Sequence, residues 1–163
     1  MCSSDLRRFE ESLVEMSNAK LFKSHYHLYI GQEATGATVV ESLRCDDKLV
    51  TTHRNHGHVL ARGADVGAAY AEILGRATGL NGGRGGTLHM SDPEHGFLAT
   101  SSVVGGCIGL ALGGAFAQKR RGKGGVSVAF FGDGSLEEGI SFESMNIAAL
   151  WKLPALFLCE NNG

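Results

Sequence analysis

Apolar residues recur every three or four positions near the start of the chain. Leu6, Phe9, Leu13 and Met16 follow this spacing, which places them on one face of a helix. The remaining positions of this stretch are mostly polar or charged. The pattern therefore predicts an amphipathic helix over residues 6–20.

The end of the chain carries two uninterrupted apolar runs instead. Residues 126–131 read VSVAFF and residues 155–160 read ALFLCE, and such short runs predict fully buried strands. A helix is expected between them over residues 136–151, with Trp151 in the core. A strand, a helix and a second strand in this order form a βαβ unit, whose strands are parallel. The predicted fold class is α/β, with a parallel sheet flanked by helices.

Further elements are expected between these two regions, with no internal repeat and no linker between domains. They are a helix over 31–44, a strand over 47–53 that runs into a polar loop at 54–58, a helix over 65–76, a glycine loop without regular structure over 79–90, and a buried helix over 103–120 that Gly122 caps.

Composition narrows the class of protein. The chain has 163 residues, 24 of them glycine, and a formal net charge of −2, which offers no broad attraction for nucleic acid or an anionic membrane. No stretch approaches the about 18 apolar residues of a membrane span. Cys107 and Cys159 lie in apolar runs, so we expect buried free thiols in a reducing compartment, the cytoplasm.

Two polar residues follow the two predicted C-terminal strands. Asp133 comes just after one strand and Asn162 just after the other, and ligands of open parallel sheets bind beyond the carboxyl ends of the strands. A carboxylate and an amide oxygen suit Mg²⁺ that keeps part of its coordination for a phosphate. Ser135 and Glu138 fit a capping box at the start of the next helix, whose first N–H groups would favour an anion.

Other interpretations of these residues stay open at this point. Asp-Gly and Asn-Asn-Gly are also common turn sequences. The chain contains neither the G-x-x-x-x-G-K-[ST] nor the G-x-G-x-x-G phosphate-binding motif, which disfavours a Rossmann dehydrogenase. His53, His56 and His58 are spaced closely enough for a zinc site, but no fourth ligand is apparent.

The chain resembles a known enzyme family in several motifs. GDGSLEEG (132–139) followed by ENN (160–162) is similar to the thiamine-diphosphate signature. Five further segments resemble, in order, the alpha chain of the thiamine-dependent dehydrogenase of 2-oxoacid dehydrogenase complexes. They are HLYIGQEA (27–34), HRNHGHVLARG (53–63), GGRGGTLHM (82–90), VVGG (103–106) and FESMNIAALWKLP (142–154).

The resemblance implies cofactor roles for individual residues. It makes Asp133 and Asn162 the Mg²⁺ ligands. It places the thiamine diphosphate against Arg54, whose guanidinium suits phosphate. The preceding position is a tyrosine in many relatives and is His53 here, which puts a phosphate contact by His53 in doubt. The other implied cofactor-binding residues are Ser102, Val104, Gly132, Gly134 and Ser135.

Two histidines match recurrent histidines of the family. His27 corresponds to one near the thiazolium ring, which implies an acid–base role toward the bound 2-oxo acid. Ordinary packing among neighbouring aromatic residues is the alternative. His56 matches the second and is the other implied catalytic residue.

The family's activity gives the functional expectation. Thiamine-dependent dehydrogenases of this type decarboxylate a 2-oxo acid and pass the acyl group to lipoamide. The alpha chain works in a heterotetramer with a beta subunit, which supplies a catalytic carboxylate, and with a lipoyl-bearing acyltransferase. The acetoin dehydrogenase alpha chain shares the pattern, and a non-catalytic half of a heteromeric thiamine enzyme is a further alternative.

The two ends of the sequence also carry expectations. Residues 1–163 correspond to part of a thiamine-diphosphate-binding domain truncated at its C-terminus, so we expect the isolated chain to be inactive. Residues 1–6, MCSSDL, do not resemble the family. A non-native sequence joined to the chain and a native variable N-terminus are both open.

Overall fold

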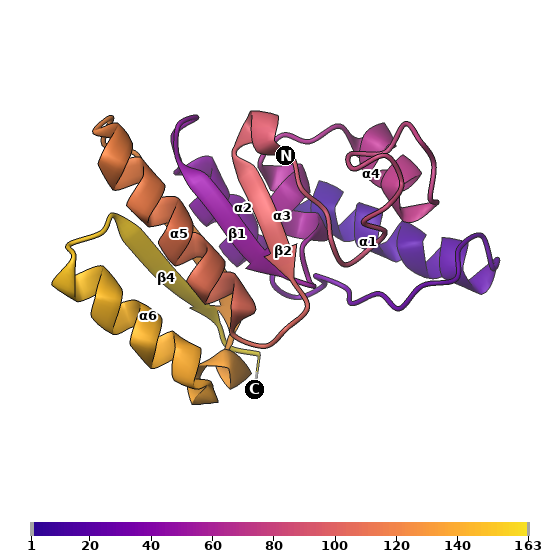
Figure 1. Ribbon diagram of the computed structural model, residues 1–163. Coiled ribbons are helices and arrows are strands. Elements are labelled where there is room, and N and C mark those ends of the chain that lie inside the picture. The colour runs from indigo at the N-terminus through magenta and orange to yellow at the C-terminus, as the bar shows by residue number, and fades with distance from the viewer. Residues whose placement is uncertain (1, 163) are drawn as a thin grey trace.

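The computed structural model describes residues 2–162 and contains one parallel β-sheet (Figure 1). Its four strands are arranged in the order β2-β1-β3-β4, and every neighbouring pair is parallel. The predicted α/β class is confirmed. The strands are β1 (Lys48–Thr52), β2 (Phe97–Ser101), β3 (Ser127–Gly132) and β4 (Ala155–Glu160).

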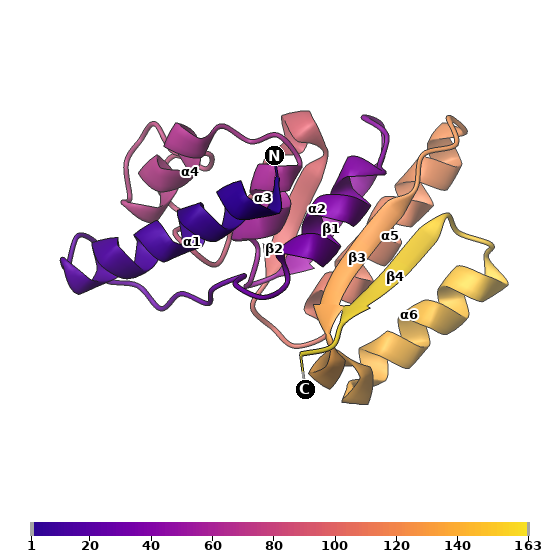
Figure 2. The same ribbon diagram turned by 180° about the vertical axis from the view of Figure 1, so that it is seen from behind.

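Helices cover both faces of this sheet. Helix α5 crosses one face with α6 beside it, and α2 and α3 lie on the other side of the sheet with α1 packed against them (Figures 1 and 2). None of the helices in residues 2–162 combines the length and apolar content needed to cross a bilayer. The α-helices are α1 (Ser3–Asn18), α2 (Glu33–Glu41), α3 (His56–Ala61), α4 (Val66–Ile73), α5 (Gly106–Arg121) and α6 (Gly139–Leu150), and two 3₁₀ helices are η1 (Pro93–His95) and η2 (Asp133–Glu137).

The strand order creates a switch point between β1 and β3. From β1 the chain passes through α3 and α4 to β2 on one side, whereas from β2 it crosses through α5 to β3 on the other side. The two connections use opposite faces of the sheet (Figures 1 and 2). In open α/β sheets the crevice at such a point is where ligands bind.

The predicted N-terminal helix and the glycine cap are confirmed. Leu6, Phe9 and Leu13 of α1 are buried in the main hydrophobic core, as their helical spacing required. Helix α5 ends at Gly122, which has a φ of 68° and donates its N–H to the carbonyls of Gln118 and Lys119. This left-handed cap leaves the basic last turn of α5 exposed.

Strand β3 is buried as predicted, whereas the expected burial around β4 is wrong in part. Five of the six residues of β3 are buried, because it is a central strand of a sheet with helices on both faces (Figures 1 and 2). Strand β4 forms the edge of the sheet in residues 2–162. Leu156 and Cys159 are exposed there, and Trp151 is 50% exposed at the end of α6. Cys107 is buried and unpaired, as expected.

Two elements differ from the sequence-based expectation. The segment expected to be a polar loop after β1 becomes helix α3, and His56 and His58 are both fully buried within it. Their polarity does not bring them to the surface, because each faces a buried carboxylate. Strand β2 is not among the predicted elements; its five residues follow the glycine-rich region after the short helix η1.

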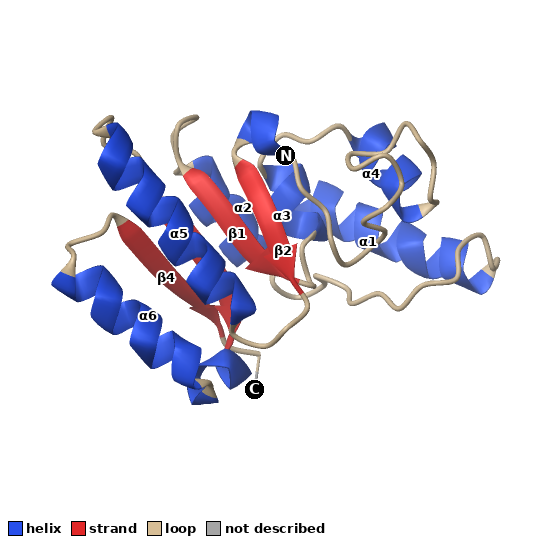
Figure 3. Cartoon of the chain, viewed as in Figure 1, coloured by secondary structure: helices blue, strands red, loops and turns tan. Residues whose placement is uncertain are grey.

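That glycine-rich region is irregular, as expected, but it is held by one side chain (Figure 3). The carboxylate of Glu72, in α4, is fully buried and accepts hydrogen bonds from four backbone N–H groups. These hydrogen bonds lower the pKa of Glu72, against the opposing effect of burial. The donors are Asn81, Gly83, Gly85 and Gly86, at distances of 2.7, 2.8, 2.5 and 3.2 Å.

Candidate functional site

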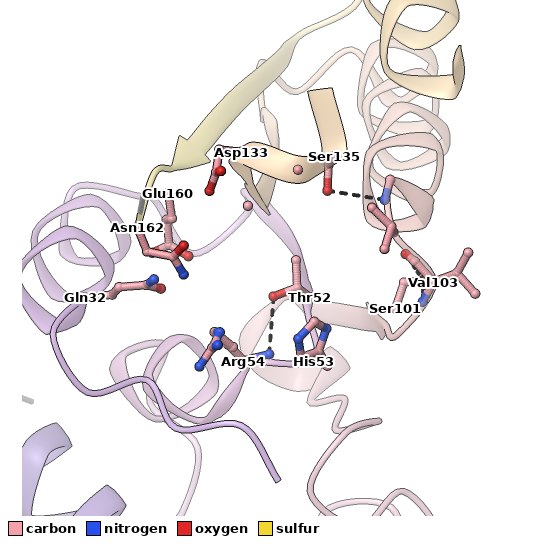
Figure 4. A pocket seen from close by; sticks show the side chains of 14 residues that line it. Gln32, Thr52, His53, Arg54, Ser101, Val103, Asp133, Ser135, Glu160 and Asn162 are labelled. Carbon is pink, nitrogen blue, oxygen red and sulfur yellow. Dashed lines mark hydrogen bonds between the residues drawn. The ribbon is translucent and has the colours of Figure 1, made fainter. Parts of the chain in front are cut away.

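A cavity of about 300 Å³ lies at the carboxyl ends of the strands (Figure 4). Residues that follow all four strands contribute to its wall, which places it at the switch point of the sheet. Its lining residues are Gln32, Thr52, His53, Arg54, Ser101, Val103, Val104, Gly105, Gly132, Asp133, Gly134, Ser135, Glu160 and Asn162.

Asp133 and Asn162 meet at this cavity because their strands are neighbours. Gly132 and Glu160 are the last paired residues of β3 and β4, so the chain leaves the sheet at the same level on both strands. Figure 4 shows Asp133, Glu160 and Asn162 on one side of the cavity. Carboxylate and amide oxygens are ligands that Mg²⁺ accepts while it retains water or phosphate oxygens.

The side chains around the cavity do not match the ligands of a zinc site. Within residues 2–162 no group of three or more histidine, cysteine, aspartate or glutamate side chains is placed to hold a metal ion. Structural zinc sites use four such ligands. Oxygen donors at the ends of β3 and β4 therefore fit a hard cation that is completed by other oxygen ligands.

The segment after Asp133 is a 3₁₀ helix, so the predicted capping box at Ser135 and Glu138 is wrong. Glu138 is extended, with φ −84° and ψ 135°, and α6 begins only after it without a side-chain cap. The Ser135 hydroxyl instead accepts a hydrogen bond from the Gly105 N–H at 3.3 Å. The backbone that lines the cavity here belongs to Gly134 and Ser135 of η2, whose first N–H groups lack intrahelical partners.

Arg54 brings a positive charge to the other side of the cavity. It lies beyond the end of β1, opposite Asp133 and Asn162 (Figure 4). Its Nη1 donates to the Leu28 carbonyl at 2.7 Å, and its backbone N–H donates to the Thr52 hydroxyl at 3.2 Å. These bonds hold the guanidinium beside the cavity with donors to spare for an anion.

His53 and His27 form an imidazole pair beside Arg54. Their ring centroids are 4.4 Å apart in an edge-to-face arrangement. His53 lines the cavity, whereas His27 is exposed and is not among the lining residues. Burial lowers the pKa of both rings, and the nearby Arg54 charge lowers both further. Both imidazoles are therefore uncharged near neutral pH when the cavity holds no anion.

Comparison with known proteins identifies the family. A family model described as the dehydrogenase E1 component matches residues 2–163. The chain belongs to the dehydrogenase E1 component family. This E1 chain is 45% identical over 159 residues to the pyruvate dehydrogenase E1 component subunit alpha of Zymomonas mobilis, which covers 97% of the chain and 45% of the relative.

A second relative carries a different name. The E1 chain is 42% identical over 159 residues to the alpha subunit of acetoin:2,6-dichlorophenolindophenol oxidoreductase of Bacillus subtilis, with 98% of the chain and 48% of the relative covered. The chain thus spans about half the length of the curated relatives that it matches.

His56 of the E1 chain does not line the cavity. Its ring is fully buried in α3, with Nδ1 3.1 Å from Glu10 Oε1 and Nε2 3.1 Å from the Thr87 carbonyl. Both ring nitrogens are thereby occupied by protein partners. The catalytic role of His56 stays a prediction, and this geometry favours an indirect one.

The loop before α5 contributes backbone to the site. Val104 lines the cavity together with its neighbours Val103 and Gly105, and its contact with the cofactor stays a prediction. Ser102 is exposed, does not line the cavity, and has its hydroxyl 3.5 Å from His89 Nε2. Its role in binding stays a prediction.

The most informative lining residue that sequence reasoning missed is Glu160. It ends β4, the residue is 8% exposed, and it lines the cavity beside Asn162. The rule that ligands gather beyond strand ends applies to it as well as to Asn162. Gln32, Thr52 and Ser101 also line the cavity and were not among the predicted site residues, although Gln32 lies within the segment HLYIGQEA.

Proposed function

We propose that this E1 chain holds Mg²⁺ and thiamine diphosphate in the cavity at the switch point. The observation that carries the proposal is the convergence of Asp133 and Asn162 at adjacent strand ends, across one cavity from Arg54. An oxygen pair for a cation and a guanidinium for phosphate are the two halves of a metal–diphosphate site.

Each part of the cofactor would face its own set of residues. Asp133 and Asn162 would hold Mg²⁺, and the backbone of Gly132, Gly134 and Ser135 would face the diphosphate together with Arg54. Val104 and Ser102 would meet the aminopyrimidine through backbone groups. Thiamine diphosphate supplies, when bound, an electron sink for decarboxylation of a 2-oxo acid.

The proposed proton-handling residue of this chain is His27. Its pKa is lowered, so its imidazole is uncharged near neutral pH and can accept or share a proton with a carboxylate or carbonyl of the substrate. His53 packs against it edge-to-face and restricts its orientation. The two rings would thus present one free acid–base group at the mouth of the cavity.

We propose that the whole protein is the alpha chain of a thiamine-dependent 2-oxoacid dehydrogenase. The acyl group would pass to a lipoyl-bearing acyltransferase, and a beta subunit would complete the active site in a heterotetramer. The names of the pyruvate and acetoin relatives support this reading. Four unpaired cysteines fit a cytoplasmic protein. Residues 1–163 would then be part of the cofactor-binding domain, inactive without the remainder.

Cofactor binding tests the proposal directly. Titration calorimetry of the full chain with thiamine diphosphate in the presence of Mg²⁺ should show metal-dependent binding. Asp133→Ala should weaken it by at least about 100-fold, because substitution of residues that only orient metal ligands already costs about 10- to 100-fold. Asp46→Ala, which removes a carboxylate outside the cavity, is the matched control and should bind like the wild type.

Two outcomes would favour the alternatives. Unchanged cofactor binding by Asp133→Ala in a complex with a beta subunit would support a non-catalytic half of a heteromer.

The substrate is tested separately, with a beta subunit and lipoamide, by comparing pyruvate with acetoin. The 45% and 42% identities of the two relatives do not separate these substrates, so turnover of acetoin alone would identify an acetoin dehydrogenase.

A further inference from the structure

Three side chains that the proposed function does not use meet behind the cavity. The Tyr29 hydroxyl donates a hydrogen bond to Glu160 Oε1, and His58 Nε2 lies 3.3 Å from the same oxygen. Tyr29 and His58 are fully buried, and Glu160 is 8% exposed. One carboxylate oxygen at the wall of the cavity is therefore bound from behind by two buried groups.

The tautomer of His58 follows from its partners. Within residues 2–162 its Nδ1 is buried without a hydrogen-bond partner. An uncharged imidazole carries one proton, and only Nε2 faces an acceptor. The Nε2–H therefore donates to Glu160, and the carboxylate receives two hydrogen bonds on one oxygen.

The position of the Tyr29 ring is fixed by its surroundings. A Cβ atom at Gly57 or at Gly36 would overlap this ring, so both positions need glycine for the ring to fit. The other faces are packed, since the Tyr29 and His58 rings are 4.5 Å apart and His58 lies 4.2 Å from Phe130. Neither donor can turn away from Glu160 without repacking the core.

The same short segment also contacts the opposite side of the cavity. Leu28 accepts the hydrogen bond from Arg54, and the adjacent Tyr29 donates to Glu160. Arg54 follows β1 and Glu160 ends β4, and these strands are separated by β3. Residues 28–29 therefore span the cavity from behind and set the distance between its cationic side and its metal-binding side.

Glu160 is two residues from the proposed metal ligand. It is paired with Gly132 at the end of the sheet, and Asp133 and Asn162 follow on the two strands. We propose that Tyr29, supported by His58, is a positioning residue that acts through Glu160 to hold the Asn162 amide opposite Asp133. This inference rests on the proposed function, because it assigns Tyr29 an effect on the metal in that site.

Tyr29→Phe tests the inference with the loss of a single oxygen atom. The expected result is that the Mg²⁺ concentration at half-saturation, measured by calorimetry at fixed thiamine diphosphate, rises about tenfold, as for other residues that orient metal ligands. Tyr70→Phe is the matched control, since its hydroxyl is bonded to the Ser12 hydroxyl at 2.5 Å, away from the cavity. It should leave Mg²⁺ affinity unchanged.

A purely structural role would give a different pattern. Both variants lose one hydrogen-bonded hydroxyl, so both are expected to lower the urea midpoint of unfolding. Only Tyr29→Phe should also alter Mg²⁺ affinity. In a Glu160→Gln background, Tyr29→Phe should change the Mg²⁺ affinity less than it does in the wild type, because the two residues act through one contact. His58→Gln should weaken Mg²⁺ binding in the same direction.

The outcomes separate this inference from the proposed function. If the wild type binds Mg²⁺ and Tyr29→Phe binds it equally well, the inference alone is overturned. The same holds if Tyr70→Phe changes the Mg²⁺ affinity as much as Tyr29→Phe does. A wild-type chain that binds neither Mg²⁺ nor thiamine diphosphate would overturn the proposed function, and the inference with it.

Discussion

Two pairs of histidines in this chain have similar sequence surroundings and opposite environments. His56 and His58 are fully buried, and each ring has one nitrogen next to a carboxylate, that of Glu10 for His56 and that of Glu160 for His58. His27 and His53 pack edge-to-face beside the cavity, and no carboxylate pairs with either within residues 2–162. Three of the four belong to the stretch HRNHGH. The partner of each ring, rather than its sequence context, separates a fold-holding histidine from one that is free for a ligand.

Removal of His56 should give the largest difference between the two histidine pairs, in the free energy of unfolding. His56→Ala leaves the Glu10 carboxylate, which is fully buried, without its ring partner. Breaking a buried pair in this way costs about 3–5 kcal/mol, so the free energy of unfolding in urea should fall by this amount. His53→Ala is the control and should change it by less than about 0.5 kcal/mol.

A conservative variant sharpens the result. His56→Gln keeps a side-chain donor for Glu10 and should recover part of the lost stability. Equal losses in His56→Ala and His53→Ala would show that the two pairs are not distinct in the way the structure indicates.

His53→Tyr should have a moderate effect, on the pH dependence of cofactor binding. Burial, His27 and Arg54 lower the pKa of His53, so the ring is uncharged at neutral pH and gains a proton only as the pH falls. A protonated ring beside a diphosphate would strengthen binding. Affinity for thiamine diphosphate with Mg²⁺ should therefore increase toward acid pH by a few-fold.

In His53→Tyr that increment should disappear, which calorimetry on either side of the His53 transition would detect. The titration of the cofactor's own phosphate is common to both proteins and cancels in the comparison. Identical pH profiles in the two proteins would exclude a diphosphate contact by His53.

In the free chain, without cofactor, Arg54→Gln should have the smallest of these effects, a shift in the titrations of two histidines. The Arg54 charge lowers the pKa of both His27 and His53, in addition to burial. Its removal should raise both pKa values without returning them to the ordinary value, because burial remains. Histidine NMR titration of the free chain would measure this. Arg120→Gln, on the exposed last turn of α5, is the matched control and should shift neither.

The sequence predicts the half of the site that follows from regular structure. Strands β3 and β4 are continuous apolar runs, so the placement of Asp133 and Asn162 at adjacent carboxyl ends followed from the βαβ rule. The glycine cap of α5 and the core face of α1 followed from local pattern in the same way. In these elements local propensity and tertiary packing agree.

The remainder depends on contacts between distant residues. Helix α3 is missed because its histidines become buried only when Glu10 and Glu160, from either end of the chain, supply their partners. The capping box fails because the Ser135 hydroxyl is occupied by Gly105, thirty residues earlier. From the sequence alone Glu160 is only the last residue of an apolar strand, and its role depends on the contact with Tyr29. Such pairs leave no periodic signal in the chain.

The carboxylate of Glu72 has a consequence for the order in which the molecule opens. Four amides of the glycine loop depend on this one side chain, so they gain protection from solvent only when α4 is in place and lose it together when α4 separates. A loop with this many glycines would ordinarily open residue by residue. We therefore expect the four amides to exchange together, in a single cooperative event governed by α4, a helix to which none of them belongs.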